Sequence, residues 1–137
     1  MTVDRPQVEQ LAPGVLVVRY EWAEHLDPSW QADLLERAAA AAAAGPVALV
    51  FVLAERIRDI APTIRVFWRT ITGDRRYRIG AVAVVTRSWA VEVAAGGFGV
   101  TNALSGAEVR VKTFRDEPSA VAWAASVTRP ATVAASG

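Results

Sequence analysis

The run VALVFVL, residues 47–53, is an unbroken apolar stretch of strand length. Gly45 and Pro46 precede it and the charged residue Glu55 soon follows it, so both of its ends are marked. A run of this kind is typical of a strand that is covered on both faces. The segment IGAVAVV, residues 79–85, has the same character. Two such runs separated by a helical pattern predict neighbouring interior strands of a parallel sheet, and therefore an α/β fold.

Before these runs, the sequence indicates a hairpin. Strands are expected at residues 7–12 and 15–20, with Pro13 and Gly14 as the turn between them. Two strands joined by so short a turn must pair antiparallel. The first strand should therefore lie antiparallel at the edge of the sheet.

Capping residues and helical spacing predict the remaining elements. Asp27 and Pro28 begin a helix that should run to about Ala44, where Gly45 ends it. Further helices are expected over residues 62–71, from Ser88 through residue 93, and from residue 118 to about residue 127, with a strand over residues 108–114.

The expected fold is a single α/β domain with a mostly parallel mixed sheet of about five strands, flanked by about four helices. The predicted order is β-β-α-β-α-β-α-β-α, with right-handed crossovers between the parallel strands. Residues 1–127 should form the domain, and residues 128–137 a frayed tail. The glycine-rich sequence does not fix the path from residue 94 to residue 106.

Composition excludes several classes of function. The chain of 137 residues has 53% apolar and 21% charged residues, no cysteine, one histidine and a net charge of +1. The small net charge argues against a nucleic-acid partner. The uncharged stretch over residues 38–53 is too short for a membrane span and is broken by Gly45 and Pro46. The polar start, MTVDRPQVEQ, is unlike a signal peptide, which together with the lack of cysteine predicts a cytoplasmic protein.

No catalytic constellation is visible. His25 stands near Glu24 and Asp27 and could act as a general base, but a solvated loop histidine is the simpler interpretation. The sequence offers neither a partnered nucleophile nor a set of metal ligands. We therefore expect a protein that is not an enzyme and needs no cofactor or metal.

Two groups of side chains are candidates for binding. Aromatic residues after successive buried strands could line an apolar ligand site or an interface, or could simply pack in the core: Phe67, Trp68, Trp89 and Phe98. Basic residues in one region could bind an anionic partner, or could form a solvated face balanced by nearby acids: Arg65, Arg69, Arg75 and Arg76.

Three phrases carry a resemblance to a known family. These are GVLVVRYEW (residues 14–22), the Trp89 segment after IGAVAVV, and VRVKTFRDEPSAVAWAAS (residues 109–126). Over most of the chain the sequence resembles the SpoIIAA-like branch of the STAS superfamily, also described as STAS/SEC14 domains. The resemblance implies a small sheet flanked by helices, often in dimers, that regulates by docking a partner protein. The SEC14 description also implies binding of an apolar ligand.

The phosphorylation switch of STAS proteins is a serine near the start of the helix after the central strand. Here AERIRDIAPT stands in its place, and Thr63 is the only hydroxyl residue between Leu53 and Ile64. A phosphate on Thr63 would lie favourably at a helix N-terminus, so this threonine is the weak phosphosite candidate.

Two functions from different classes follow. The first is a non-enzymatic regulatory or interaction module that docks a protein partner or a second copy of itself. The alternative is a carrier or sensor of an apolar small molecule or lipid. A carrier should enclose an apolar cavity, whereas a docking module should expose an apolar or arginine-rich patch.

Overall fold

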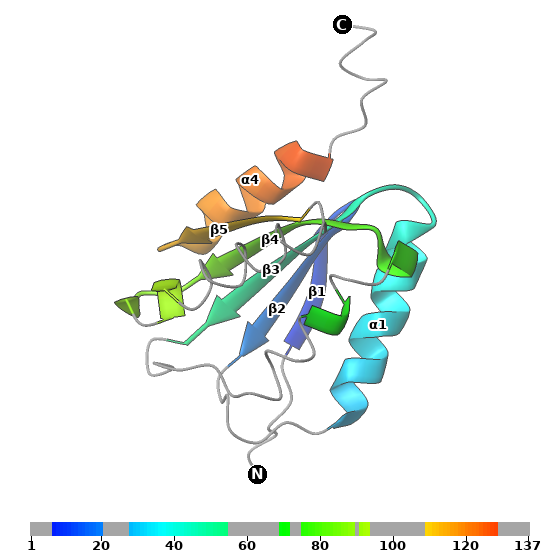
Figure 1. The fold of residues 1–137 in the computed structure, drawn as a ribbon, viewed down its shortest axis with the longest axis horizontal. Helices are drawn as coiled ribbons and strands as arrows, with labels where there is room; N and C mark the ends of the chain where they lie inside the picture. The colour runs from blue at the N-terminus through cyan, green and yellow to red at the C-terminus, as the bar shows by residue number, and fades with distance from the viewer. Residues whose placement is uncertain are drawn as a thin grey trace, which may run out of the picture.

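A five-stranded mixed sheet forms the centre of the fold (Figure 1). The computed structural model describes residues 7–20, 28–54, 69–71, 75–89, 91–93 and 109–128. The strands lie in the order β1-β2-β3-β4-β5. Their bounds are β1 Gln7–Ala12, β2 Val15–Tyr20, β3 Val47–Leu53, β4 Ile79–Val85 and β5 Arg110–Phe114. β1 pairs antiparallel with β2, and every other pair is parallel, which confirms the predicted fold class and the antiparallel edge strand.

The two apolar runs that decide the fold are neighbouring interior strands, as predicted. β3 pairs with β2 on one side and with β4 on the other, with Leu49 opposite Val82 and Phe51 opposite Val84. Nearly every side chain of both strands is buried. Both faces of these strands are covered, so the usual alternation of apolar and polar residues is absent from them.

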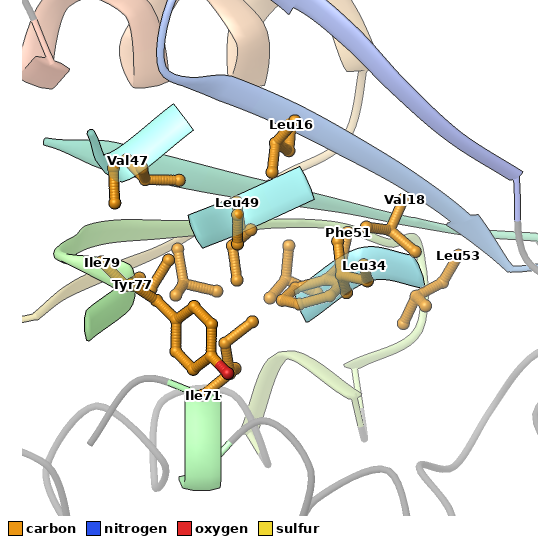
Figure 2. Close-up of a cluster of buried hydrophobic side chains, with 14 of the residues drawn as sticks. Leu16, Val18, Leu34, Val47, Leu49, Phe51, Leu53, Ile71, Tyr77 and Ile79 are labelled. Carbon is orange, nitrogen blue, oxygen red and sulfur yellow. The ribbon is translucent and has the colours of Figure 1, made fainter. Parts of the chain in front are cut away.

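Two layers of apolar side chains cover the two faces of the sheet. On the first face, Leu49 and Phe51 of β3 pack with Leu34 of α1 (Pro28–Ala42) and with Ile71, which has helical conformation (Figure 2). Val91, also helical, belongs to the same layer. Right-handed crossovers that always step in the same direction place their helices on one face, which accounts for this arrangement.

The second face is covered by α4 (Glu117–Thr128), the helix that follows the last strand (Figure 1). Ala120 and Ala124 are fully buried against this face of β3 and β4, which presents the small side chains Ala48, Ala81 and Ala83. Small residues on both sides allow the helix to approach the sheet closely. Helical conformation thus occurs in all four places where the sequence predicts a helix, and the predicted element order is confirmed.

The hairpin turn is tied to β3 by backbone contacts. Gly14 adopts a φ of 78°, and its carbonyl oxygen accepts a 2.7 Å hydrogen bond from the amide of Ala48. A Cβ at residue 14 would lie 2.6 Å from the carbonyl oxygen of Pro46. Glycine is therefore required here for both backbone conformation and space.

Three predicted boundaries are corrected by the structure. α1 ends at Ala42 rather than Ala44, because the amide of Ala44 turns to the carbonyl of Ala41 and Arg78 Nη1 donates to the carbonyl of Ala42 at 3.1 Å. A run of alanines favours helix throughout, so propensity alone does not mark the end. The last strand begins at Arg110, two residues later than predicted.

The third correction concerns the end of the last helix, which was expected at about residue 127. Thr128 is the last residue of α4, is buried, and donates its hydroxyl hydrogen to the carbonyl of Ala124 at 3.1 Å. The ordered helix therefore continues one residue beyond the predicted boundary at residue 127. The expected helix start at Asp27, most of the helix over residues 62–71, the path over residues 94–106 and residues 129–137 lie outside the described residues.

Candidate functional site

The carboxyl end of β4 leads into a short segment that hydrogen bonds hold in place. The amide of Thr86 donates to the carbonyl oxygen of Phe114 at 2.9 Å, so the ends of β4 and β5 stay together. The buried hydroxyl oxygen of Thr86 accepts a hydrogen bond from the amide of Ser88 at 3.0 Å. This turn fixes where the next helical residues begin.

Ser88 caps the helical residues that follow, as the sequence predicts. Its Oγ accepts a hydrogen bond from the amide of Val91 at 3.4 Å, and its carbonyl oxygen accepts one from the amide of Glu92 at 3.0 Å. Val91 is fully buried in the first core layer. Because Val91 fixes the inward side, Trp89 and Val93, which lie two residues to either side of it, are turned outward.

Trp89 and Val93 form an exposed apolar pair. Trp89 is 76% exposed and Val93 is 55% exposed, and they are four residues apart, which places them on one side of a helix. Glu92 lies on the same side, and its carboxylate is 4.0 Å from the guanidinium of Arg115, whose side chain is 78% exposed. We call these four residues (Trp89, Glu92, Val93 and Arg115) the Trp89 surface.

The predicted aromatic group is only partly described. Trp89 lies at the carboxyl end of β4, where the sequence places it, whereas Phe67, Trp68 and Phe98 lie outside the described residues. The high exposure of Trp89 favours an interface over the lining of an enclosed pocket. The pocket therefore stays a prediction that rests on the three aromatic residues outside the description.

The predicted basic group is also incomplete. Arg69 and Arg76 are exposed, and the guanidinium of Arg76 lies 5.4 Å from the ring centre of Tyr77, a cation–π contact. Arg75 belongs to the 3-10 helix η1 (Arg75–Tyr77), but its side chain lies outside the described residues, as do Arg65 and Thr63. The anionic-partner patch and the Thr63 switch therefore stay predictions.

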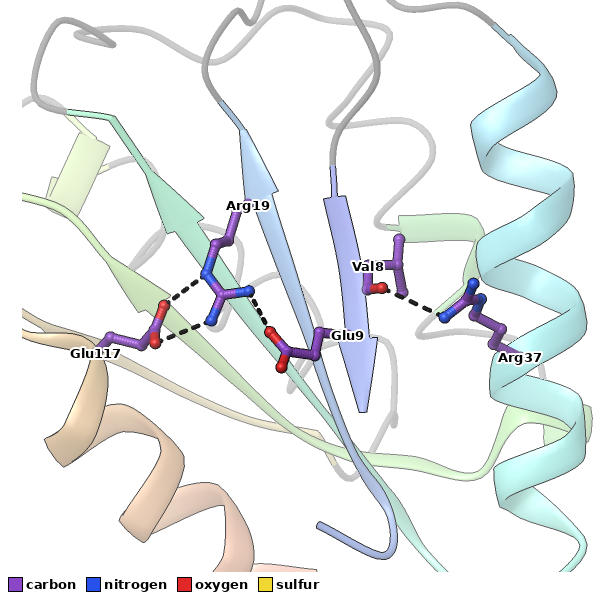
Figure 3. A network of polar contacts seen from close by, with 5 residues as sticks. All are labelled: Val8, Glu9, Arg19, Arg37 and Glu117. Atoms are coloured by element: carbon purple, nitrogen blue, oxygen red, sulfur yellow. Dashed lines mark hydrogen bonds and ion pairs between the residues drawn. The ribbon is translucent and has the colours of Figure 1, made fainter. Parts of the chain in front are cut away.

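A polar network on the second face of the sheet was not predicted from the sequence. Arg19 of β2 donates from Nε and Nη2 to the two carboxylate oxygens of Glu117 at 2.9 and 3.0 Å, and from Nη1 to Glu9 at 2.7 Å (Figure 3). The hydrogen bond with Glu117, followed by that with Glu9, raises the pKa of Arg19. The signal in the sequence was a lone arginine in the apolar strand VLVVRY.

This network is structural. The guanidinium of Arg19 is shared between the carboxylates of Glu9 and Glu117, and the network joins the start of α4 to the two strands of the hairpin. In the same view, Arg37 of α1 donates to the carbonyl oxygen of Val8 at 3.3 Å, so α1 reaches across the outer edge of β1 (Figure 3).

The described residues show no metal-binding chemistry. They contain no group of three or more histidine, cysteine, aspartate or glutamate residues that could hold a metal ion. Their buried polar side chains are those of Thr86 and Thr128, and both hydroxyl groups are hydrogen bonded. Within this part of the chain, no helix is long and apolar enough to span a membrane.

The fold places the chain in the class of α/β domains with a mixed five-stranded sheet and helices on both faces. Comparison with protein-family models found no match, and comparisons with curated proteins and with solved structures found none either. The resemblance to the SpoIIAA-like branch of the STAS superfamily therefore stays a prediction from the sequence.

Proposed function

We propose that the protein is a non-enzymatic interaction module of the STAS/SpoIIAA-like type that self-associates through the Trp89 surface. The observation that carries this proposal is the 76% exposure of Trp89 on a helical turn that is itself held firmly by the Ser88 cap and by buried Val91. A large aromatic side chain presented by an ordered element is the usual anchor of a protein interface.

The energy available from this anchor is substantial. A tryptophan buries up to about 200 Å² at an interface. Covering the exposed 76% of Trp89 would thus remove roughly 150 Å² from water, a hydrophobic contribution of about 4 kcal/mol at about 25 cal/mol per Å², from which the free-energy cost of association is subtracted. Val93, four residues away, would extend the same contact.

The charges beside Trp89 favour a second copy of the chain as the partner. An interface around a two-fold axis must be complementary to itself. Glu92 and Arg115 carry opposite charges on one surface, and their separation of 4.0 Å is at the limit of an ion pair. Across a two-fold axis, each could pair with its opposite on the other copy. The net charge of +1 means that two copies repel one another only weakly.

Sedimentation analysis tests the proposal. The wild-type chain should sediment as a dimer, and Trp89→Ala should shift it to monomer with an unchanged circular dichroism spectrum. Leu11→Ala is the matched control, because Leu11 is also a large apolar residue, 42% exposed, but lies on β1. This control should stay dimeric.

Charge exchange tests the two-fold arrangement. Glu92→Arg and Arg115→Glu should each weaken the dimer, and the double exchange should restore it. A wild-type monomer at every concentration up to about 1 mM would overturn the proposal. So would native mass spectrometry that finds a bound lipid on a monomer, because that result favours the carrier function instead.

A further inference from the structure

β5 forms one edge of the sheet and carries two positive charges on one face. It is the last strand of the order, and no other strand among the described residues pairs with its outer side. Arg110 and Lys112 lie opposite Ala81 and Ala83 in the register, so they share the face that α4 covers farther in. Both are exposed. Among the described residues, no strand uses the outer backbone donors and acceptors of this edge, and two side-chain cations lie beside them.

These cations have no acidic partner among the described residues. The ammonium of Lys112 lies 5.3 Å from the ring centre of Phe114, and that ring packs against Trp123 at 5.6 Å. The lysine is thus oriented by an aromatic ring, which leaves its charge available to an incoming group. Arg110, two residues away, projects from the same face about 7 Å along the strand.

We propose that the β5 edge binds an extended acidic segment of a different protein as a sixth strand. Main-chain hydrogen bonds to the edge would hold the segment, and acidic residues at alternate positions would face Arg110 and Lys112. The two-residue spacing of the cations matches the spacing of side chains on one face of the added strand.

A second copy of this chain does not fit the edge. Antiparallel pairing of two β5 strands centred on Val111 would set Arg110 opposite Lys112 of the other copy, and pairing centred on Lys112 would set the two lysines opposite one another. Like charges directly opposite destabilise a strand pair. The β1 edge of another copy is a poorer match, because Arg37 already occupies the carbonyl oxygen of Val8 and the carboxylate of Glu9 is already paired with Arg19. The inference is therefore independent of self-association through the Trp89 surface.

Binding of labelled synthetic peptides, followed by fluorescence anisotropy, tests this inference. The first probe is an octapeptide that alternates glutamate and valine, and the second alternates lysine and valine. The acidic peptide should bind the wild type and the basic peptide should not. The variant Arg110→Glu with Lys112→Glu should bind the acidic peptide about tenfold more weakly and gain affinity for the basic one.

Two controls separate strand addition from simple charge attraction. An acidic peptide N-methylated at alternate amides keeps its charges but cannot complete the ladder, and it should not bind. Trp89→Ala should bind the acidic peptide as the wild type does. The proposal is overturned if the methylated peptide binds equally well, if Trp89→Ala abolishes binding, or if single-stranded DNA competes as effectively as unlabelled acidic peptide.

Discussion

Overpacking the contact between α4 and the sheet should destabilise the domain. Ala124 is fully buried against a face that presents the small side chains Ala48, Ala81 and Ala83. Ala124→Leu replaces a methyl group by an isobutyl group at a buried contact where both surfaces present small side chains. Such insertions cost about 1–3 kcal/mol, because the helix must lift or the side chains must leave their preferred rotamers. At roughly 4 °C per kcal/mol for a chain of this size, the Tm should fall by about 4–12 °C.

Ala122→Leu is the matched control for this prediction. Ala122 lies on the exposed side of the same helix, and leucine has almost the same helix propensity as alanine. The unfolding free energy of the Ala122→Leu variant should stay within about 0.5 kcal/mol of that of the wild type. Urea unfolding followed by circular dichroism measures the unfolding free energy of both variants. The m value, the slope of this free energy against urea concentration, should stay unchanged if the unfolded state is unaffected. Equal stability of Ala124→Leu and wild type would refute the close packing, and a loss only in Ala122→Leu would mean that α4 packs through its other side.

Two further predictions concern the start of α4. A double-mutant cycle of Arg19→Gln and Glu117→Gln should give a coupling free energy of about 1 kcal/mol in urea unfolding, because this ion pair is bidentate and two-thirds buried. The same cycle for Arg19 and Glu9, a more exposed pair, should give about 0.3 kcal/mol. Equal coupling free energies would contradict this ranking. Hydrogen bonds from Ser119, first from its backbone amide and then from its side chain, hold the pKa of Asp116 below its ordinary value of 3.8. The ionised carboxylate therefore stabilises the fold at a pH above 3.8, and this stabilisation is lost as the pH falls through the lower pKa of the folded state. Asp116→Asn keeps a capping oxygen but does not titrate, so the difference in unfolding free energy between wild type and this variant should shrink from pH 5 to pH 2. Asp116→Ala should be less stable than both at pH 7. If the difference between wild type and Asp116→Asn does not change with pH, the assignment is contradicted.

The sequence predicted the strands well because each lies in an unambiguous pattern. VALVFVL and IGAVAVV combine strand length, complete apolarity and marked ends, and both are interior strands. Ser88 was expected at a helix start, and its hydroxyl oxygen accepts the capping hydrogen bond from the amide three residues on, as the carboxylate of Asp116 does at the start of α4. A helix cap depends only on a few neighbouring residues, so the sequence predicts it without knowledge of the fold.

Hydropathy does not predict which side of α4 packs against the sheet. The helix EPSAVAWAASVT has one charged residue, and its apolar residues occur on every side. What selects the packed side is size, since Ala120 and Ala124 are one turn apart and meet the alanines of β3 and β4. Side-chain volume at a contact depends on the partner surface, which the helix sequence alone does not contain.

The candidate site divides in the same way. Trp89 was correctly placed after β4, because strand order and the capping serine fix that position. Its exposure was not predictable, since it follows from which side of a short helical segment Val91 buries. Arg19 was likewise visible only as an irregularity, because its partner Glu117 is 98 residues away in the chain.

The alternation of side-chain size within β3 explains why the two faces take different helices. On the first face the strand presents Leu49 and Phe51, which fill a thick layer beneath α1 and the other crossover helices. On the second face it presents Ala48 and Val50, which leave only a thin layer. A helix can cover the thin layer only if its own contact residues are small, as those of α4 are. A strand has a period of two, so a one-residue slip of β3 would exchange the two layers and leave neither helix a matching surface. The run VALVFVL therefore specifies both the register of the central strand and the face of the sheet that each helix covers.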